Sequence, residues 1–353
     1  MRKLRIAQLV PFEETVPPTK YGGTELVASN LSDGLVKQGH DVTLYSVGGS
    51  KTKAKLVKVF PGPLRAHTGA EMKQRESLKF MGVGKVLTAV IKGNFDIVHN
   101  HIGWRVLPFT DIIPHPIVTT LHGPLDIEYQ RLVYKPYSHS PFVSISNNQR
   151  KPLKLNYAAT VYNGIRVDTF PYLEKKDDYL AFLGRMSPEK GPVQAIQVAK
   201  KTKRRLIMAA KVDAVDVKYF NEKVKPLIDG KQIKFLGEVD HVGKSKLLSH
   251  AAGLLALIQW EEPFGLFMAE ANACGTPVIA MARGAAPEVI AHKKTGYLVH
   301  STEEAARMVS KLGIIKPKAC RTRAQAHFSV EAMVAGYVKV YEKLIHEYRT
   351  RRG

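Results

Sequence analysis

The chain has 353 residues, of which 44% are hydrophobic, so it is long enough and apolar enough to form two globular domains. Lysine and arginine outnumber aspartate and glutamate by 53 to 31, and the formal net charge of +22 predicts a surface that attracts anions. No run of eighteen apolar residues occurs and the only cysteines are Cys274 and Cys320, which excludes a membrane-spanning helix and a disulfide framework.

The first residues and the low cysteine content bear on where the protein works. Residues 4–10 are apolar, but the run is too short and too interrupted for a secretory signal peptide and fits a first buried strand better. We therefore expect a cytoplasmic protein, which the basic surface could bring to the inner face of an anionic membrane. General solubility would explain the charge equally well. No nucleic-acid-binding motif accompanies it, so nucleic acid is not an expected partner.

The N-terminal residues follow the pattern of a strand–helix–strand unit. Strands are predicted at residues 4–10 and 42–46, with a helix at 24–38 between them. Gly22 and Gly23 lie where the first strand leads into the helix. Glycine lets a backbone approach a ligand closely, and a helix N-terminus favours phosphate. A glycine pair more often marks an ordinary turn, so the signal is weak by itself.

Residues 51–93 have the least distinct pattern. A helix is expected from about residue 72 to 92, because apolar residues recur at helical spacing among lysines and arginines. A basic amphipathic helix of this kind can dock on anionic lipid. The simpler interpretation is a solvated helix face.

Histidines stand at the ends of two further predicted strands. His99 and His101 are two residues apart and would point the same way on a strand, as metal ligands can. No third ligand is evident, so a structural or acceptor-side role fits them better. His122 follows a strand at residues 116–121, at the carboxyl end where ligands bind in open parallel sheets. An ordinary loop histidine would have the same local sequence.

The second half begins with a strand at residues 179–183, followed by the segment Gly184-Arg185-Met186-Ser187-Pro188-Glu189-Lys190-Gly191 and a helix. Arg185 and Lys190 are five positions apart in this loop, so both can reach one diphosphate. Arginine would make a two-pronged contact and lysine would act as a point charge. Many loops contain both residue types, so the spacing alone does not decide.

The most informative stretch, residues 253–288, predicts a strand at 253–258, a loop, a helix after Gly265 and a strand at 278–281. Glu262 lies at the tip of the loop and Glu270 lies eight positions on, in the helix. A helix start attracts phosphate, whereas carboxylates repel it, so the glutamates make sense beside sugar and ribose hydroxyls. They could instead simply stabilise the helix dipole. The first interpretation indicates a nucleoside diphosphate sugar as ligand.

This stretch resembles the signature of the retaining glycosyltransferases of family four, in which two glutamates separated by seven residues precede a helix of small residues and Gly-x-Pro-Val, here Gly275 to Val278. The resemblance covers nearly the whole chain in order, through Gly22-Gly23, Phe95-Asp96-x-x-His99-x-His101, Asn163-Gly164 and Gly184-Arg185-x-x-x-x-Lys190-Gly191. This sequence departs from the family pattern in two places. In the family's hinge motif, which begins here at Asn163-Gly164, the aspartate (Asp168) comes two positions later than in the family. Ala210-Lys211 stand where many relatives have glycine.

The resemblance implies an α/β protein of the GT-B fold, with two Rossmann-like domains facing across a cleft. We expect an acceptor domain at residues 1–168, with a C-terminal helix at about 330–353 packing back on it, and a donor domain at 169–329. The implied enzyme is a hexosyltransferase-type glycosyltransferase (EC 2.4). It would move a sugar from a nucleoside diphosphate sugar to a hydroxyl of a glycan, lipid-linked or small-molecule acceptor, with retention and without a metal or other cofactor.

Roles for individual residues follow from the same resemblance. Arg185 and Lys190 would stabilise the departing diphosphate, Glu262 would bind sugar hydroxyls, Glu270 would bind ribose, and His122 would steady the sugar near its anomeric carbon. The base would be held by main-chain groups around Val239. The residues expected to act in catalysis are His122, Arg185, Lys190 and Glu262, and those expected to bind the donor are Gly22, Gly23, Arg185, Lys190, Val239, Gly265, Leu266 and Glu270.

Two other classes of protein would share some of these sequence features. A nucleotide-sugar epimerase on the same fold would also use glutamate and histidine in its cleft. A nucleic-acid-binding protein would have a similar net charge. A dinucleotide oxidoreductase is disfavoured, because no Gly-x-Gly-x-x-Gly follows the first strand.

Overall fold

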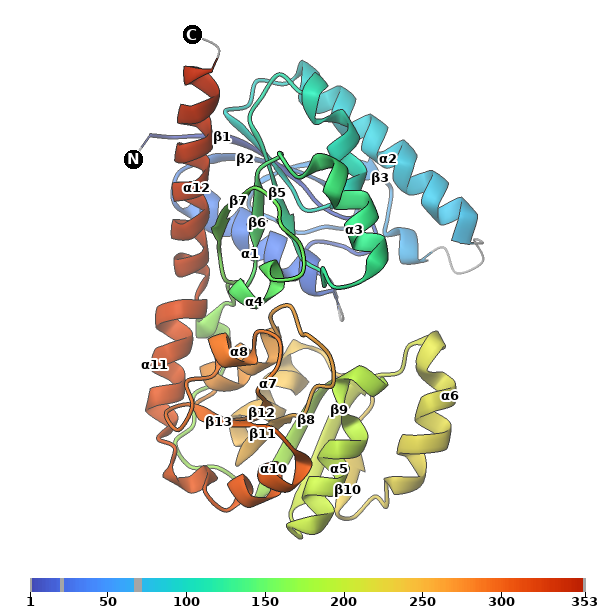
Figure 1. The fold of residues 1–353 in the computed structure, drawn as a ribbon, viewed down its shortest axis with the longest axis vertical. Helices are drawn as coiled ribbons and strands as arrows, with labels where there is room; N and C mark the ends of the chain where they lie inside the picture. Colours follow the sequence, from blue (N-terminus) through green and yellow to red (C-terminus); the bar gives the residue numbers. More distant parts are fainter. Residues whose placement is uncertain (1, 20–21, 67–71, 352–353) are drawn as a thin grey trace. The chain divides into compact units, whose positions relative to one another are not determined.

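The computed structural model describes residues 2–19, 22–66 and 72–351, and the chain divides into two compact units (Figure 1). Unit 1 comprises Met1–Gly164 and Val330–Gly353, and unit 2 comprises Ile165–Ser329. The boundary that the sequence suggested, at 168/169, lies slightly later, in the 3-10 turn η4 (Val167–Thr169).

Unit 1 is built on a seven-stranded parallel sheet in the order β3-β2-β1-β4-β5-β6-β7. Every residue of β4 and β5 is buried, as expected for central strands that are covered on both faces. The order reverses between β1 and β4, which makes the carboxyl ends of these strands a topological switch point. The strands are β1 (Arg5–Leu9), β2 (Asp41–Val47), β3 (Lys55–Phe60), β4 (Ile97–Asn100), β5 (Ile117–Leu121), β6 (Phe142–Ser144) and β7 (Tyr157–Thr160).

The C-terminal helix α12 belongs to unit 1 and packs against α1 (Figure 1). Two of its tyrosines, Tyr337 and Tyr341, are fully buried. Arg349 lies within this helix, whereas Arg352 lies outside the described residues. The helices and 3-10 turns of unit 1 are α1 (Gly23–Lys37), η1 (Leu64–Ala66), α2 (Met72–Lys92), η2 (Trp104–Ile112), α3 (Glu128–Tyr134), η3 (Lys135–Tyr137), α4 (Asn147–Arg150) and α12 (Val330–Thr350).

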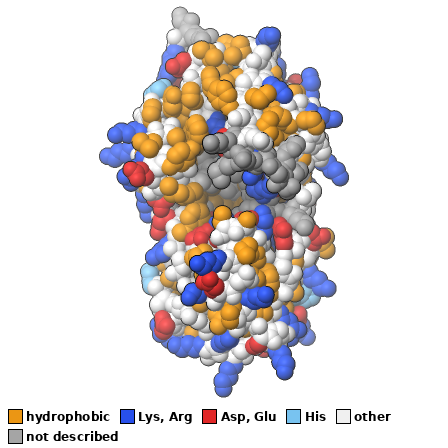
Figure 2. Space-filling model, turned by 90° about the vertical axis from the view of Figure 1, so that its right-hand side faces the viewer, with side chains coloured by type: hydrophobic (Ala, Val, Ile, Leu, Met, Phe, Trp, Pro, Cys, Tyr) orange, Lys and Arg blue, Asp and Glu red, His pale blue; other side chains and the backbone are white. Residues whose placement is uncertain are grey.

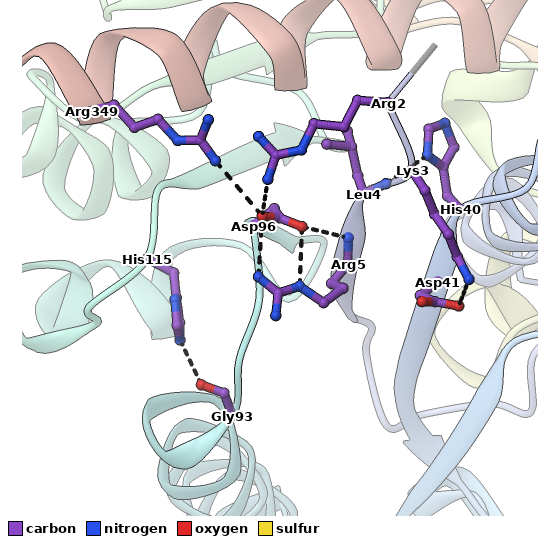
Figure 3. Close-up of polar contacts among 10 residues, drawn as sticks. All are labelled: Arg2, Lys3, Leu4, Arg5, His40, Asp41, Gly93, Asp96, His115 and Arg349. Atoms are coloured by element: carbon purple, nitrogen blue, oxygen red, sulfur yellow. Dashed lines mark hydrogen bonds and ion pairs between the residues drawn. The ribbon is translucent and has the colours of Figure 1, made fainter.

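Figure 3 shows how charged side chains tie the amino end of β4 to β1 and α12. Asp96, just before β4, is buried and accepts hydrogen bonds from Arg5 and Arg2, while Arg349 of α12 lies 4.0 Å away. Burial alone would raise the pKa of Asp96, but the hydrogen bonds and charges of the arginines lower it below its usual value. The aspartate of the Phe-Asp-x-x-His-x-His motif is therefore a structural clamp, at the end of β4 opposite the histidines.

Unit 2 contains a six-stranded parallel sheet in the order β10-β9-β8-β11-β12-β13, whose switch point lies between β8 and β11. The strands are β8 (Tyr179–Arg185), β9 (Arg205–Lys211), β10 (Ile233–Phe235), β11 (Gly253–Ala256), β12 (Val278–Met281) and β13 (Gly296–Val299). The helical segments are η5 (Pro188–Lys190), α5 (Pro192–Lys201), η6 (Ala214–Asp216), α6 (Val217–Tyr219), η7 (Phe220–Val224), η8 (Lys225–Leu227), α7 (His241–His250), α8 (Leu266–Ala273), α9 (Ala286–Val289), α10 (Thr302–Val309), η9 (Leu312–Ile314) and α11 (Pro317–Phe328).

Most predicted strands and helices are present, and the differences have local causes. The edge strands β3 and β7 were missed because one is lysine-rich and the other is a half-buried Tyr-Ala-Ala-Thr segment with little apolar pattern. Helix α7 begins at His241, because Asp240 caps it by accepting from the Gly243 amide at 2.8 Å. Arg185, expected in a loop, is the last residue of β8. Among the described residues, no helix is both long and apolar enough to cross a membrane.

Candidate active site

In unit 2, the loops that follow β8 and β11 meet at the switch point of the sheet. The Gln259 amide donates to the Glu189 carbonyl at 2.7 Å and joins the two loops. Gly191 has a left-handed conformation (φ 70°), and a Cβ atom there would collide with the Leu257 carbonyl oxygen. Only glycine allows this approach, and it brings Lys190 beside the loop that carries Glu262.

Lys190 and Glu262 form an ion pair at this point. The lysine side chain is 12% exposed and the glutamate side chain 10% exposed, so the pair is largely shielded from water. The Trp260 indole N–H donates to Glu262 Oε2 at 3.0 Å, and Lys190 Nζ lies 5.0 Å from the Trp260 ring centroid. The Glu262 carbonyl accepts from the Ala285 amide at 2.9 Å, which fixes the loop from its other side.

Arg185 belongs to a neighbouring ion-pair network. It contacts Glu189 and lies 3.4 Å from Asp213, which Lys211 also contacts at 2.7 Å. Burial alone would raise the pKa values of Glu189 and Asp213, but hydrogen bonds and the neighbouring cations lower both. These carboxylates therefore stay ionised and balance the cations at the carboxyl edge of β8 and β9.

Glu270 lies in α8, is buried, and pairs with Lys244 of α7 at 2.5 Å. Lys244 Nζ is also 5.6 Å from the Phe170 ring centroid. Sequence reasoning assigned Glu270 but missed Lys244. The available signal was its place in the first turn of the helix that follows the loop around Val239.

The start of α8 has the properties expected of an anion site. Its N-cap, Gly265, has a left-handed conformation and no side chain with which to cap the helix, and the first turn contains no acidic residue. Leu266, the first residue of the helix, is half-buried. Val239 is half-buried in the loop between β10 and α7.

Taken together, the unit 2 site combines four cations with four carboxylates among the described residues. The cations are Arg185, Lys190, Lys211 and Lys244, and the carboxylates are Glu189, Asp213, Glu262 and Glu270. Each positive charge has a negative partner in the protein. An anion that binds Lys190 must therefore compete with Glu262, whose oxygens would then be released to accept hydrogen bonds from hydroxyls.

In unit 1, the switch point carries histidines. His122 Nε2 lies 2.8 Å from His101 Nδ1, and His101 Nε2 lies 2.9 Å from the Gln8 amide oxygen on β1. His99 bridges Tyr341 Oη and Thr120 Oγ1, each at 2.7 Å. The two histidines of the His-x-His motif are therefore bound to protein side chains. Among the described residues, no group of three or more His, Cys, Asp and Glu side chains could hold a metal ion.

Burial keeps these histidines uncharged. It lowers the pKa of His122 to about 4 and the pKa values of His99 and His101 well below the usual range. Burial also raises the pKa of Tyr341. At neutral pH the unit 1 cluster is thus a set of neutral hydrogen-bonding groups, unlike the ion pairs of unit 2.

Gly22 and Gly23 form the start of α1, with Gly22 as N-cap. A Cβ atom on Gly22 would lie 2.8 Å from Pro18 Cβ and 3.1 Å from a Glu25 carboxylate oxygen, so local packing already requires glycine. Glu25 is buried, which raises its pKa. The adjacent Tyr21 lies outside the described residues. Contact of this glycine pair with a donor remains a prediction.

Two parallel-sheet units, with polar side chains gathered at both switch points, define the class of GT-B glycosyltransferases. Comparison with known proteins agrees. A model described as Glycosyltransferase Family 4 matches residues 21–166, and one described as Glycosyl transferases group 1 matches residues 168–327. The chain belongs to this family of group 1 glycosyltransferases and is an enzyme of class EC 2.4.

Several relatives and solved structures are similar over almost the whole chain. A D-inositol 3-phosphate glycosyltransferase from Mycobacterium sp. (strain KMS) is 23% identical, over 94% of this chain and 87% of that protein. AviGT4, a glycosyltransferase involved in avilamycin A biosynthesis, superposes with a TM-score of 0.75 at 23% identity, covering 97% and 98% of the two chains. Sucrose-phosphate synthase from Thermosynechococcus elongatus gives 0.82 at 18% identity, covering 97% and 100%.

Proposed function

We propose that the enzyme transfers a sugar from a nucleoside diphosphate sugar to an acceptor hydroxyl, with retention of anomeric configuration, and that unit 2 binds the donor. The observation that carries this proposal is the convergence of Lys190, Glu262 and the start of α8, whose N-cap is Gly265, at the carboxyl ends of β8 and β11. Cations there suit a diphosphate, and the glutamate suits hydroxyls.

The departing diphosphate develops negative charge, and preorganised positive groups are the usual means of stabilising it. In the proposed mechanism, Lys190 and Arg185 bind the diphosphate together with the first amides of α8. Glu262 then turns to the sugar hydroxyls and Glu270 to the ribose. Because side chains and helix amides supply the positive charge, the reaction needs no metal ion. The main chain around Val239 would hold the base, and Gly22 and Gly23 would face the phosphates.

Retention is proposed to follow from attack on the face of the sugar that the diphosphate leaves, with the leaving phosphate taking the acceptor proton. Glu262 and Glu270 are each tied to a lysine. This arrangement suits holding hydroxyls better than attacking an anomeric carbon, as a glycosidase nucleophile does. His122 would contact the transferred sugar from unit 1.

The neighbouring proteins suggest where to begin with substrates. HepE from Anabaena, at 16% identity and a TM-score of 0.71, was crystallised with UDP-glucose. The curated mycobacterial relatives are named for D-inositol 3-phosphate. We therefore propose a uridine or related nucleoside diphosphate sugar as donor, and a polyol or carbohydrate hydroxyl as acceptor.

Thermal unfolding with a panel of nucleoside diphosphate sugars tests donor binding, since a ligand of the native state raises the melting temperature by an amount that grows with the logarithm of its concentration relative to its dissociation constant. The matching donor should raise the melting temperature, and the rise should be lost in Lys190→Ala. Product analysis without acceptor should show slow hydrolysis only. Conversion to an epimeric sugar, or no stabilisation by any donor, would contradict the proposal.

We further propose that unit 1 contacts anionic membrane through α2, which would suit a lipid-linked acceptor. Phe80 and Met81 on α2 are 67% and 55% exposed, and Lys85 and Lys92 are exposed on the same helix. Figure 2 shows hydrophobic side chains gathered on this part of the molecule, with Lys and Arg at its edges. Exposed apolar and basic side chains on one helix fit an interfacial contact.

Co-sedimentation with vesicles distinguishes this contact from a solvated helix face. Binding should require anionic lipid, weaken in salt, and fall in the double variant Phe80→Ser/Met81→Ser. Val215→Ser is the matched control, because Val215 is an apolar side chain of unit 2 that is 85% exposed. Equal binding to neutral and anionic vesicles, or no binding to either, would contradict the membrane proposal. Either result would leave the proposal that unit 2 binds the donor unaffected.

A further inference from the structure

Seven side chains of unit 1 form one continuous set of hydrogen bonds, which we call the His–Tyr chain. It runs from His122 through His101 and Gln8 to Tyr341, and on through His99 and Thr120 to Tyr337. All of these residues except His122 are buried, and His122 is half-buried at the open end. The chain thus connects helix α12 with the end of β5.

The direction of the hydrogen bonds in the His–Tyr chain is set at Gln8. Its amide nitrogen donates to Tyr341 Oη at 3.2 Å, so its amide oxygen accepts from His101 Nε2 at 2.9 Å. A neutral imidazole has one donor and one acceptor. His101 Nδ1 must therefore accept, and the donor is His122 Nε2 at 2.8 Å. His122 then carries its proton on Nε2, and Nδ1 is a bare acceptor.

The other half of the chain agrees with this direction. Tyr341 accepts from Gln8, so its own proton goes to His99 Nδ1 at 2.7 Å, and His99 Nε2 donates to Thr120 at 2.7 Å. A proton added to His99 or His101 would put two donors face to face, which opposes protonation as burial does. In the described part of the chain, Nδ1 of His122 makes no hydrogen bond, so a ligand can use it.

We propose that Gln8, His101 and Tyr341 are positioning residues that fix the tautomer of His122, so that its Nδ1 accepts a hydrogen bond from a hydroxyl of the transferred sugar. This inference rests on the proposed function, because it requires the sugar to lie against His122. It assigns a function to the His-x-His motif: His101 orients His122, and His99 links Tyr341 of α12 to Thr120 of β5.

The tautomer can be observed directly in protein labelled with ¹⁵N-histidine, with the His122 signals assigned by their loss in His122→Asn. At pH 7.5 we expect a protonated Nε2 and an unprotonated Nδ1. In Gln8→Met, which removes the amide while keeping the side-chain length, the two tautomers should mix. Tyr337→Phe is the matched control. Tyr337 is hydrogen-bonded to Thr120 at the end of the His–Tyr chain that is farthest from His122, so this variant should leave the His122 signals unchanged.

Activity provides the second readout. Gln8→Met should lower kcat about tenfold, the scale of one lost oriented hydrogen bond, while the affinity for the nucleoside diphosphate is unchanged. If Gln8→Met does not fold, Tyr341→Phe frees the same amide and should give the same tautomer mixing. A protonated Nδ1 or a cationic His122 in the wild type, or an unaltered tautomer in both variants, would overturn the inference. Failure of every nucleotide to bind would instead reject the proposed donor site, and the tautomer would still be measurable.

Discussion

The two units place opposite kinds of side chain at the same topological position. At the switch point of unit 2, cations and carboxylates pair with one another, whereas at the switch point of unit 1 uncharged histidines, a glutamine and tyrosines form hydrogen bonds. If unit 2 binds a diphosphate, as proposed, the site needs positive charge, and carboxylates balance that charge before the ligand binds. A site for a sugar needs oriented hydrogen bonds and no charge that would have to be desolvated.

The difference also affects stability. The unit 2 pairs are partly shielded, so removing one partner leaves the other charge without compensation, which costs more than an exposed pair contributes. The unit 1 cluster contains no charge to lose, but all of its groups except the half-buried His122 are buried and hydrogen-bonded, and an orphaned buried group there costs about 1–3 kcal/mol. Substitutions should therefore act mainly through ligand and charge in unit 2, and through orientation in unit 1.

The largest expected effect is that of Lys190→Ala. If Lys190 stabilises the departing diphosphate, kcat/KM should fall about 1,000-fold, the scale found when a preorganised transition-state contact is removed. Steady-state transfer assays measure this, and circular dichroism should show an unchanged fold. Lys200→Ala, at an exposed lysine of α5, is the control and should retain activity. Near-normal transfer by Lys190→Ala would mean that the ion pair with Glu262 is only structural.

A second, smaller effect is expected at the pair of Glu270 and Lys244. Glu270→Gln should weaken nucleoside diphosphate binding about 30-fold, because the carboxylate would no longer accept from two ribose hydroxyls. If Lys244 serves only to hold Glu270, then Lys244→Met combined with Glu270→Gln should bind no more weakly than Glu270→Gln alone. Calorimetric titration provides the constants. Additive losses would show that Lys244 contacts the nucleotide itself.

Much of this comparison was predictable from local sequence. The order of strands and helices and the positions of the motifs at strand ends follow from hydrophobic spacing and glycines, which act over a few residues. The resemblance then identified the family. The functional roles of the site residues, the absence of a metal requirement and the retaining mechanism remain predictions.

Pairings between distant residues could not be predicted in the same way. Lys190 and Glu262 were assigned to different parts of the donor, and nothing within either motif shows that they pair across 72 positions. Gln8 and Tyr341 are 333 positions apart, and neither residue lies in a motif that indicates the pairing. The edge strands β3 and β7 were missed because partly exposed edges carry little apolar pattern.

A third prediction concerns pH and tests whether the unit 1 cluster is neutral. The pKa of His122 is about 4 in the folded chain and near 6.5 when unfolded, so its contribution to stability is complete above pH 6.5 and is lost as pH falls towards 4. In His122→Asn, the asparagine amide can still donate to His101. As the pH is lowered from 6.5 to 5, the free energy of unfolding of this variant should fall less steeply than that of the wild type. The two slopes should differ by up to about 1.4 kcal/mol per pH unit.

Urea denaturation at several pH values measures this slope. His40, His99, His101 and His241 also have lowered pKa values, so the wild type keeps a steep dependence and the comparison must be made between the two proteins. Identical slopes would mean that His122 already titrates normally in the folded chain. The hydrogen-bond direction assigned to unit 1 would then be untenable near neutral pH.

The smallest effect is expected for Trp260→Phe. The indole N–H donates to Glu262 at 3.0 Å and its ring lies beside Lys190, so tryptophan supports both members of the ion pair. Phenylalanine keeps an aromatic face for the cation but removes the donor. Because Lys190 still holds Glu262, transfer should slow only about threefold, less than the full value of a hydrogen bond to a charged group. Trp260→Leu, which also removes the aromatic face, should be slower again in the same assay. Equal rates for the two variants would show that the ring contributes nothing to holding Lys190, and that the charges of unit 2 are arranged by the ion pair alone.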